Sequence, residues 1–306
     1  MNKKPVIIDT DPGIDDAVAL GIALYSEELD VRLITTVNGN VSLEKVTYNM
    51  LRLMKFFNKQ IPIAKGAAIP LIVEPVDASD IHGETGMDGY DFEEADESLL
   101  LDEHAVTAMK REILTSDEPV TLVPIGPLTN IALLFRTYPE VKQNIKEIVM
   151  MGGSTGRGNS SVMAEFNIYA DPEAAKIVFA SGVPIAMAGL DVGLKALVYP
   201  EDSEVLKDMN KTGNMIYHLF KKYRGGSFNH GLKMYDSCAV AYLLKPDLFE
   251  VAHSYVDVEL DGALTKGTTV VDLKGKMNKT PNVNVCVDID AKEFKKWFMK
   301  SIQKCN

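Results

Sequence analysis

Short apolar runs rich in β-branched residues alternate along the chain with segments of helical periodicity. The helical patterns span 43–57, 105–114, 130–136 and 172–180. The apolar runs, each leading into a turn that contains glycine, are 6–8, 31–37, 61–64, 120–125, 148–151 and 183–188. Such alternation is typical of parallel βαβ units. It predicts an α/β fold, with a doubly wound, mostly parallel, Rossmann-like sheet flanked by helices over about the first two-thirds of the chain.

The last third of the chain continues with strand and helix patterns. Residues 268–273 and 283–289 predict additional C-terminal strands, and Phe294, Trp297 and Phe298 form the apolar face of a last helix. With 306 residues, 46% of them hydrophobic, the chain can bury a large core. It contains no repeat, linker or low-complexity stretch, so we predict one domain over residues 1–306.

Two glycine-bearing segments, 77–96 and 223–235, lack a clear periodicity. The first contains His82, and the second contains Tyr223, Arg224 and His230. Loops of this length inside a compact domain often serve as lids over a binding site. We predict two mobile lids, with disordered surface excursions as the alternative.

The first apolar run is followed by an unusual density of acids. Asp9, Asp11, Asp15 and Asp16 lie within eight residues, at a predicted junction between a strand and a helix. Strand alternation gives Asp9 and Asp11 the same side-chain direction, and Asp15 and Asp16 fall in the first helical turn. In open α/β sheets, ligands bind beyond the carboxyl ends of the strands. These acids are therefore candidates for a binding site.

Two explanations of the acids compete. In the structural one, a single Asp caps the helix, Pro12-Gly13 makes the turn, and the other acids are solvated. Four carboxylates packed so closely would repel one another unless a cation neutralised them. Hard divalent cations prefer several oxygen ligands, so the sequence favours a metal site.

The overall charge narrows the range of partners. A formal charge of −11 argues against a nucleic acid polymer, because affinity for its backbone comes from clustered Lys and Arg. The dinucleotide fingerprint and the Walker A motif are absent. An acidic pocket without nearby cations suits a neutral small molecule.

The compartment is predicted from three further features. The sequence has neither the pattern of a signal peptide nor a long apolar span, which indicates a cytoplasmic protein without membrane contact. Cys238, Cys286 and Cys305 are odd in number and widely spaced, as expected of reduced thiols.

Other polar groups follow the predicted strands. They are Asn40 after the second strand, residues 126–130 after the fourth, Gly152-Gly153 after the fifth, and a cluster of Asn159, Glu165 and Asn167. Carboxamides and carboxylates suit sugar hydroxyls, which need donors and acceptors, although each group alone is typical of turns and caps. Asp236 precedes an apolar helical run, so it is either an acid at a helix N-terminus or a distant metal ligand.

Several motifs in order carry a resemblance to a known family. They are DTDPGIDDA, HGETGMDGYDF, IGPLTNIALL, MGGSTGRGN, AEFNIYADPEAA and GTTVVD. Together they resemble the inosine-uridine family of nucleoside hydrolases, and within it the broad-specificity purine and pyrimidine ribonucleoside hydrolases of bacteria. The similarity extends over nearly the whole chain. It implies the nucleoside hydrolase fold, a homotetramer or dimer, and a role in nucleoside salvage.

The resemblance also implies a division of labour in the site. It implies Ca²⁺ held by Asp11, Asp16, the backbone carbonyl of Ile125 and Asp236. The ribose would be held by Asp15, Asn40, Asn159, Glu165 and Asn167, with Met151 packed against it. A metal-bound water would attack the anomeric carbon with Asp11 as general base, releasing ribose and the free base through an oxocarbenium-like state. Asp9 would support the acidic loop.

The chain departs from the family pattern where the nucleobase leaves. Many relatives have His immediately before the late metal-binding Asp, whereas this chain has Tyr235. A phenol, with a reference pKa of about 10, is a poorer acid at neutral pH than imidazolium. We expect Tyr235 to contact the nucleobase, with proton donation as an alternative role. His82, Tyr223 and His230 on the predicted lids are candidates to compensate.

Two other functions fit parts of the sequence. A strand that ends in Asp-Thr-Asp is also found in haloacid-dehalogenase-like phosphatases, which would use Mg²⁺, although Asp15 and Asp16 would repel a phosphoryl group. A nucleoside-binding protein without catalysis would fit the replacement of His by Tyr235. Ribonucleoside hydrolysis remains the main prediction.

Overall fold

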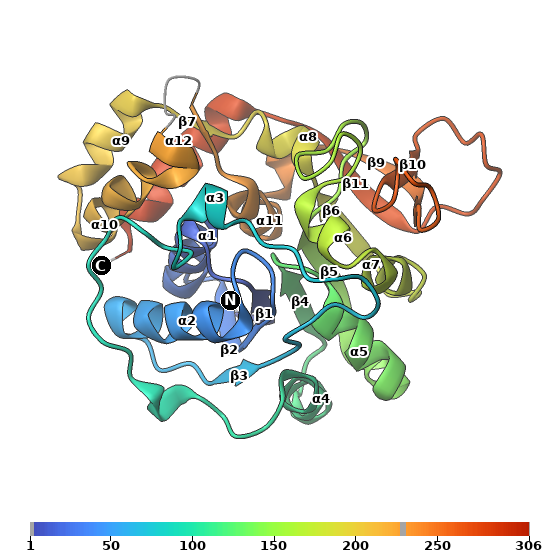
Figure 1. Cartoon of the computed structure of the whole chain (residues 1–306), viewed down its shortest axis with the longest axis horizontal. Coiled ribbons are helices and arrows are strands. Elements are labelled where there is room, and N and C mark those ends of the chain that lie inside the picture. Colours follow the sequence, from blue (N-terminus) through green and yellow to red (C-terminus); the bar gives the residue numbers. More distant parts are fainter. Residues whose placement is uncertain (1–2, 227–230, 306) are drawn as a thin grey trace.

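The computed structural model describes residues 3–226 and 231–305, and its centre is a sheet of nine strands in the order β10-β9-β11-β6-β5-β4-β1-β2-β3 (Figure 1). The strands are β1 (Lys4–Thr10), β2 (Leu29–Thr36), β3 (Ile63–Lys65), β4 (Val120–Pro124), β5 (Ile145–Met151), β6 (Ile185–Ala188), β9 (Phe249–Val258), β10 (Thr269–Asp272) and β11 (Val283–Ile289). Every pairing from β3 to β11 is parallel, whereas β9 runs antiparallel to both β11 and β10. A separate pair joins β7 (Leu197–Val198) to β8 (Leu232–Lys233).

Helices cover both faces of this sheet (Figure 1). They are α1 (Ile14–Tyr25), α2 (Leu43–Phe57), α3 (Ser79–His82), α4 (Ala105–Thr115), α5 (Thr129–Thr137), α6 (Phe166–Ala170), α7 (Pro172–Phe179), α8 (Leu190–Gly193), α9 (Pro200–Lys207), α10 (Lys211–Phe220), α11 (Tyr235–Leu244) and α12 (Ala291–Gln303). One core packs α1, α2, α10, α11 and α12 against the sheet, and a second core packs α4, α5 and α7 against the opposite face.

The central strand β1 shows why the sequence has short continuous apolar runs. Val6 and Ile8 belong to one core, while Ile7 between them belongs to the other. All three side chains are at most 2% exposed. A parallel strand covered by helices on both faces has no solvent side, so its residues do not alternate between apolar and polar.

The predicted fold class is confirmed, and the C-terminal third extends the same sheet. The predicted strands at 268–273 and 283–289 correspond to β10 and β11, and β11 pairs parallel with β6. Strand β9 and helices α9 and α10 were not predicted. In β9, Glu250 and Val251 are both exposed, so the strand has no continuous apolar run that would mark it.

The segment 77–96 is anchored to the core. It contains the one-turn helix α3, and the side chains of Met87 and Phe92 are 2% and 6% exposed. The Phe92 ring packs edge-on against Phe56 of α2, with ring centroids 5.7 Å apart. This segment is therefore not a disordered excursion. Its movement as a lid stays a prediction.

The second predicted lid is only partly described. Tyr223–Gly226 form a 3₁₀ turn, and β8 and the start of α11 follow after a gap. His230 lies outside the described residues.

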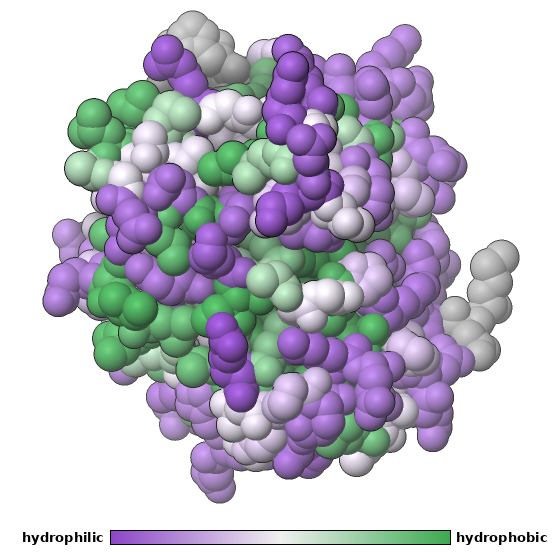
Figure 2. All heavy atoms as spheres, turned by 90° about the vertical axis from the view of Figure 1, so that its right-hand side faces the viewer, coloured by the Kyte–Doolittle hydropathy of each residue, from purple (hydrophilic) through white to green (hydrophobic). Residues whose placement is uncertain are grey.

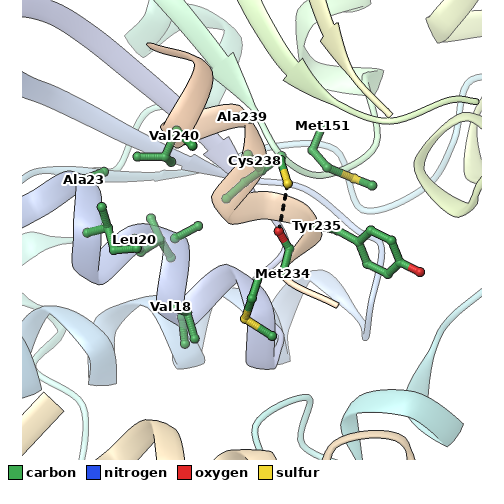
Figure 3. Close-up of a cluster of buried hydrophobic side chains, with 14 of the residues drawn as sticks. Val18, Leu20, Ala23, Met151, Met234, Tyr235, Cys238, Ala239 and Val240 are labelled. Carbon is green, nitrogen blue, oxygen red and sulfur yellow. Dashed lines mark hydrogen bonds between the residues drawn. The ribbon is translucent and has the colours of Figure 1, made fainter. Parts of the chain in front are cut away.

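The cysteines of the chain are free, and its surface mixes polar and apolar side chains. Cys238, Cys286 and Cys305 are free and buried, and the Cys238 thiol donates to the carbonyl of Met234 at 3.2 Å (Figure 3). Polar and apolar side chains are interspersed on the face in Figure 2. Among the described residues, no helix has both the length and the apolar character needed to cross a membrane.

Candidate active site

A cavity of about 260 Å³ lies beyond the carboxyl ends of the central strands. Ile125 follows β4 and Met151 ends β5, so both come from neighbouring strand ends. The cavity also brings together most of the residues proposed from the sequence, namely Asp15, Asn40, His82, Asn159, Glu165, Asn167, Tyr223, Tyr235 and Asp236. Asp11 and Asp16 are 1% exposed and lie behind this lining.

Asp16 fixes the loop between β1 and α1. Its Oδ1 accepts a hydrogen bond from the Thr10 hydroxyl at 2.7 Å, and its Oδ2 accepts from the Gly13 amide at 3.0 Å. The Asn40 side chain donates to the same Oδ2 and to the Asp11 carbonyl, both at 3.0 Å. This one carboxamide therefore joins the strand-end acid to the acid in the first turn of α1.

Asp11 is held by the loops that follow β2 and β4. Its Oδ2 accepts from the Asn40 amide at 2.8 Å, whereas its Oδ1 is buried and has no hydrogen-bond partner among the described residues. A Cβ on Gly39 or on Gly126 would collide with the Asp11 carboxylate, so both positions require glycine. Burial, with the neighbouring charge of Asp16, raises the pKa of Asp11 well above its usual range.

Three acids, Asp16 among them, converge beneath the cavity. Asp15, Asp16 and Asp236 each offer a carboxylate oxygen within 4.8 Å of the others. Burial raises the pKa of Asp15 to about 6, and burial followed by the charge of Asp15 raises the pKa values of Asp16 and Asp236. Such a group costs free energy when fully ionised and unneutralised. The cluster, together with the unpartnered oxygen of Asp11, therefore fits a bound cation.

The backbone carbonyl of Ile125 is oriented by Asn167. The side-chain NH₂ group of Asn167 donates to this carbonyl at 2.9 Å and to the Met151 carbonyl at 3.2 Å. A carbonyl oxygen has a second lone pair, so Ile125 can still accept or coordinate another group. The Oδ1 of Asn167 has no hydrogen-bond donor among the described residues and remains able to accept from a ligand.

Glu165 and Asn159 frame another wall of the cavity. Glu165 caps α6 by accepting from the amides of Asn167 and Ile168, and its Oε2 also accepts from Gly153 at 2.9 Å. Burial raises its pKa in spite of these bonds. Asn159 accepts from the Phe166 amide at 2.9 Å, which leaves its NH₂ group to donate. Glu165 and Asn159 can therefore stabilise the local backbone and still bind a ligand.

Asp9 lies below the site and does not line the cavity. Its Oδ1 accepts from the Thr35 hydroxyl at 2.5 Å and from the Asn130 amide at 2.8 Å. Burial raises its pKa to about 7. These contacts tie β1, β2 and α5 together, and the support of the acidic loop by Asp9 stays a prediction.

His82 is held in one neutral form. Its Nδ1 accepts a hydrogen bond from the Ile14 amide at 3.0 Å, so in the neutral ring the proton is on Nε2. Burial lowers its pKa to about 4. His82 is 5% exposed and lines the cavity beside Tyr223, whose ring centroid lies 5.2 Å away. At neutral pH it is therefore a hydrogen-bond donor rather than a charged acid.

Tyr235 begins α11 and extends out of the apolar cluster that surrounds Cys238 (Figure 3). It is 5% exposed and forms part of the cavity wall. Burial raises its pKa further above the ordinary value of a phenol. Asp236 follows directly in the first turn of the same helix, so α11 supplies an aromatic and an acidic group to one site.

Arg224 also lines the cavity, although the sequence placed it only on a predicted lid and not among the binding residues. Its guanidinium carbon lies 5.3 Å from the Tyr223 ring centroid and 5.8 Å from that of Tyr235. The prediction of an acidic pocket without nearby cations is therefore wrong. Arg224 belongs to an irregular turn, and no periodicity or motif spacing places such a residue in the site; only its position beside Tyr223 could have suggested it.

The fold and the site together define an α/β protein with buried carboxylates and a polar cavity at the carboxyl ends of its strands. The chain belongs to the inosine-uridine preferring nucleoside hydrolase family, whose sequence profile matches residues 6–296. It is thus an enzyme of the N-glycosidase class, and the family resemblance noted from the motifs is confirmed. Membership of this family also excludes the alternative of a haloacid-dehalogenase-like phosphatase.

Similar proteins cover almost the whole chain. The non-specific ribonucleoside hydrolase RihC of Escherichia coli strain SMS-3-5 is 53% identical over 295 residues, which are 96% of this chain and 97% of that protein. RihC of Escherichia fergusonii is 50% identical over 304 residues, covering 99% of this chain and all of the relative. The structure of a purine-preferring ribonucleoside hydrolase from Gardnerella vaginalis is 30% identical, with a TM-score of 0.89 and 98% coverage of both chains.

Proposed function

We propose that this chain hydrolyses the N-glycosidic bond of both purine and pyrimidine ribonucleosides, giving ribose and the free base. One observation carries the proposal: buried carboxylates converge beneath a cavity whose walls present amide donors and acceptors suited to a ribose. The names of the most similar relatives, non-specific ribonucleoside hydrolases, support the broad choice of base.

We infer that Ca²⁺ is the cofactor. Asp11, Asp16, Asp236 and the carbonyl of Ile125 would hold it, and the unpartnered Oδ1 of Asp11 supports this assignment. When bound, Ca²⁺ would act as a Lewis acid with about six to eight oxygen ligands, enough to include a ribose diol and a water. Asp15, which also belongs to the carboxylate cluster, is assigned to the ribose.

Asp11 is the proposed general base. Its Oδ1 is buried and has no hydrogen-bond partner among the described residues, so this oxygen can accept the proton of a water. Asp11 takes a proton as the water oxygen bonds to the anomeric carbon, and the electron pair of the N-glycosidic bond leaves with the nucleobase. Positive charge develops on the ribose ring in this step, and the surrounding carboxylates stabilise it.

The ribose is oriented by groups that the protein already holds in place. The free acceptor of Asn167 and the free donor of Asn159 suit hydroxyls of opposite roles, and Glu165 can accept from a further hydroxyl. Asn40, fixed between Asp11 and Asp16, keeps its side-chain oxygen for the ligand. Met151 packs against the sugar. Fixed groups of this kind lower the entropy cost of reaching the reactive geometry.

The segments 77–96 and 223–235 are the proposed lids. Residues of both, including Ala78, His82 and Tyr223, line the cavity, so closure would exclude water from the reaction. Hydrogen exchange of their amides should slow when a substrate analogue binds.

A nucleoside panel tests the proposal. With Ca²⁺ present, inosine, adenosine, uridine and cytidine should release ribose, and their 2′-deoxy forms should lose most of the turnover because the diol is incomplete. Release of phosphate from nucleotides in place of ribose would contradict the proposal, and so would binding of nucleosides without turnover. The latter result would favour the non-catalytic alternative.

Nucleoside salvage in the cytoplasm and assembly into a homotetramer or dimer are further parts of the proposal. Exposed apolar side chains available for contacts between subunits include Ile69, Ile72, Val162 and Leu264. Sedimentation of the purified protein measures the oligomeric state directly.

A further inference from the structure

We propose that Arg224 is the group that activates the leaving nucleobase, by hydrogen bonding to the base and stabilising the negative charge that it acquires as the N-glycosidic bond breaks. The inference rests on the proposed hydrolysis and assigns to it a catalytic residue that the motifs do not contain. Three observations carry it: the position of Arg224, its unused donors, and the lack of another charged donor among the described residues of the aromatic wall.

The guanidinium is fixed between two aromatic rings of the cavity wall. It lies 5.3 Å from the Tyr223 ring centroid and 5.8 Å from that of Tyr235, within the range of cation–π contact. Both tyrosines line the same cavity as Arg224. The backbone of Arg224 has a φ of 52°, in the left-handed region that an arginine seldom adopts. Local strain of this kind is typical of residues whose position serves a function.

The donors of Arg224 are largely unused. Its Nε is buried without a hydrogen-bond partner, and no carboxylate forms an ion pair with it among the described residues. A buried, unpaired N–H group costs free energy unless a ligand satisfies it. The guanidinium interacts with the Tyr223 side chain through a hydrogen bond. Its charge also acts on the Asp15 carboxylate, although the two groups form no ion pair. The positive charge therefore remains available to a ligand.

The other polar groups of this wall are weaker candidates for the same task. A phenol such as Tyr235 keeps its proton at neutral pH and is a weak acid. His82 donates only as a neutral ring, because its Nδ1 accepts from the Ile14 amide. A guanidinium keeps its charge at all physiological pH values and presents several N–H groups in one plane. It can stabilise an anion without transferring a proton.

The chemistry balances without a further reagent. Water supplies the hydroxyl that bonds to the anomeric carbon, Asp11 receives the proton, and the electron pair of the broken bond moves onto the ring nitrogen and the ring carbonyl of the base. Arg224 donates hydrogen bonds to that carbonyl or nitrogen, and the base regains a proton after it leaves. The N–H groups of Arg224 need an acceptor on the base. Hypoxanthine and uracil have a ring carbonyl, whereas adenine has an amino group instead, so inosine and uridine should react faster than adenosine.

Substrates with different leaving groups test this assignment. Arg224→Gln, Arg224→Lys and the matched control Lys222→Gln, an exposed cation two residues away, would be compared on inosine, uridine and p-nitrophenyl β-D-ribofuranoside. The p-nitrophenolate anion is stable and needs no activation. We expect Arg224→Gln to lower kcat for the nucleosides by about 10²–10³-fold, the range for loss of one transition-state donor, while kcat for the nitrophenyl riboside changes by less than about tenfold. Arg224→Lys should recover part of the loss, and Lys222→Gln should behave as the unaltered enzyme.

Three results would overturn parts of the scheme, and they can be told apart. An equal loss on nucleosides and nitrophenyl riboside would mean that Arg224 only shapes the site, and unchanged turnover in Arg224→Gln would mean that it takes no part. Either result refutes the role of Arg224 while leaving hydrolysis intact. If the unaltered enzyme released no ribose from any nucleoside, the proposed function itself would be wrong.

Discussion

The two oxygens of Asp11 have different surroundings, and this difference defines a test of the general base. Oδ2 accepts from the backbone amide of Asn40, while Oδ1 has no hydrogen-bond partner in the described parts of the chain. Asp11→Asn keeps the size of the side chain but removes its charge and basicity. We expect kcat for ribose release to fall by at least about 10²–10⁴-fold, the contribution of a positioned general base. A colorimetric assay for reducing sugar measures this loss.

The control for Asp11→Asn is Asp102→Asn, which makes the same chemical change at an exposed residue. Circular dichroism should give the native spectrum for both variants. Retention of near-normal turnover by Asp11→Asn would eliminate the assignment of this residue as the base.

Tyr235 provides a second test at the scale of one residue. Burial raises the pKa of Tyr235, so proton transfer from its hydroxyl at neutral pH is unfavourable. Tyr235→Phe should therefore lower kcat for inosine and uridine by less than about tenfold, compared with about 10²–10⁴-fold for loss of a general acid. The ring still lines the cavity in this variant, so turnover should be kept. Loss of the hydroxyl contact should appear mainly in KM. A large fall in kcat that is restricted to nucleosides would instead show that the hydroxyl donates the proton.

The sequence predicted the acidic residues of this site better than its arginine, Arg224. Asp11, Asp15 and Asp16 are close in the sequence, and the turn between a strand and a helix brings them together by local geometry alone. Arg224 and Asp236 reach the site only because α10 and α11 pack over the sheet. The motif match supplied Asp236, but nothing comparable marked Arg224. Residues whose placement depends on distant packing need either a motif or a structure.

At the scale of elements, the N-terminus of α7 joins two loops near the site. Asp171 caps this helix by accepting from the Ala174 amide at 3.0 Å, and it also accepts from the Leu71 amide at 2.9 Å and the Thr129 hydroxyl at 2.7 Å. Asp171 is fully buried. Asp171→Ala would remove the cap and leave two donors unsatisfied, so we expect the free energy of unfolding to fall by about 2–4 kcal/mol. Urea denaturation followed by circular dichroism measures this change.

Asp290 offers a matched comparison on another helix. It caps α12 by accepting from the amides of Lys292 and Glu293, but it is exposed and serves no other element. Asp290→Ala should cost only about 1 kcal/mol, the usual value for an N-cap. Equal losses in the two variants would show that the bonds from Asp171 to Leu71 and Thr129 add nothing to stability.

The periodic part of the chain was the predictable part of the fold. The predicted helix 43–57 coincides with α2, and the predicted strand 283–289 coincides with β11. Both have strongly patterned sequences and one clear buried face. By contrast, the short helices α3 and α8 and the strand β9 have little apolar surface of their own to mark them. Their conformation depends on the elements against which they pack.

At the scale of the whole molecule, the sheet separates two apolar cores but supports one acidic centre. The acids lie at the strand ends, between the cores, where burial is deep and few cations are present. The chain as a whole has a formal charge of −11, so its surface does not offset these charges. Stability of the fold should therefore depend on the cation more strongly than in a protein whose metal is bound by exposed groups.

The sign of this dependence follows from the raised pKa values. Asp15, with a pKa raised from 3.8 to about 6, stays protonated in the fold at pH values where the unfolded chain has already lost the proton. Without metal, the contribution of Asp15 to stability should be complete below about pH 4 and should be lost as the pH rises through about 6. Ca²⁺ neutralises the ionised carboxylates, so its stabilising effect should grow over the same range.

Thermal unfolding with and without a chelator tests this expectation. At a Ca²⁺ concentration about 100 times Kd, the metal adds about 2.7 kcal/mol, which corresponds to a rise in Tm of roughly 4 °C for a chain of 306 residues. We expect that rise at pH 8, a much smaller one at pH 5, and little at either pH in Asp236→Asn. Equal shifts at both pH values would mean that Ca²⁺ binds away from the titrating acids, whereas stabilisation by Mg²⁺ alone would mean that the site selects a smaller ion. A rise confined to high pH and lost in Asp236→Asn would tie the stability of the whole fold to the carboxylates beneath the cavity.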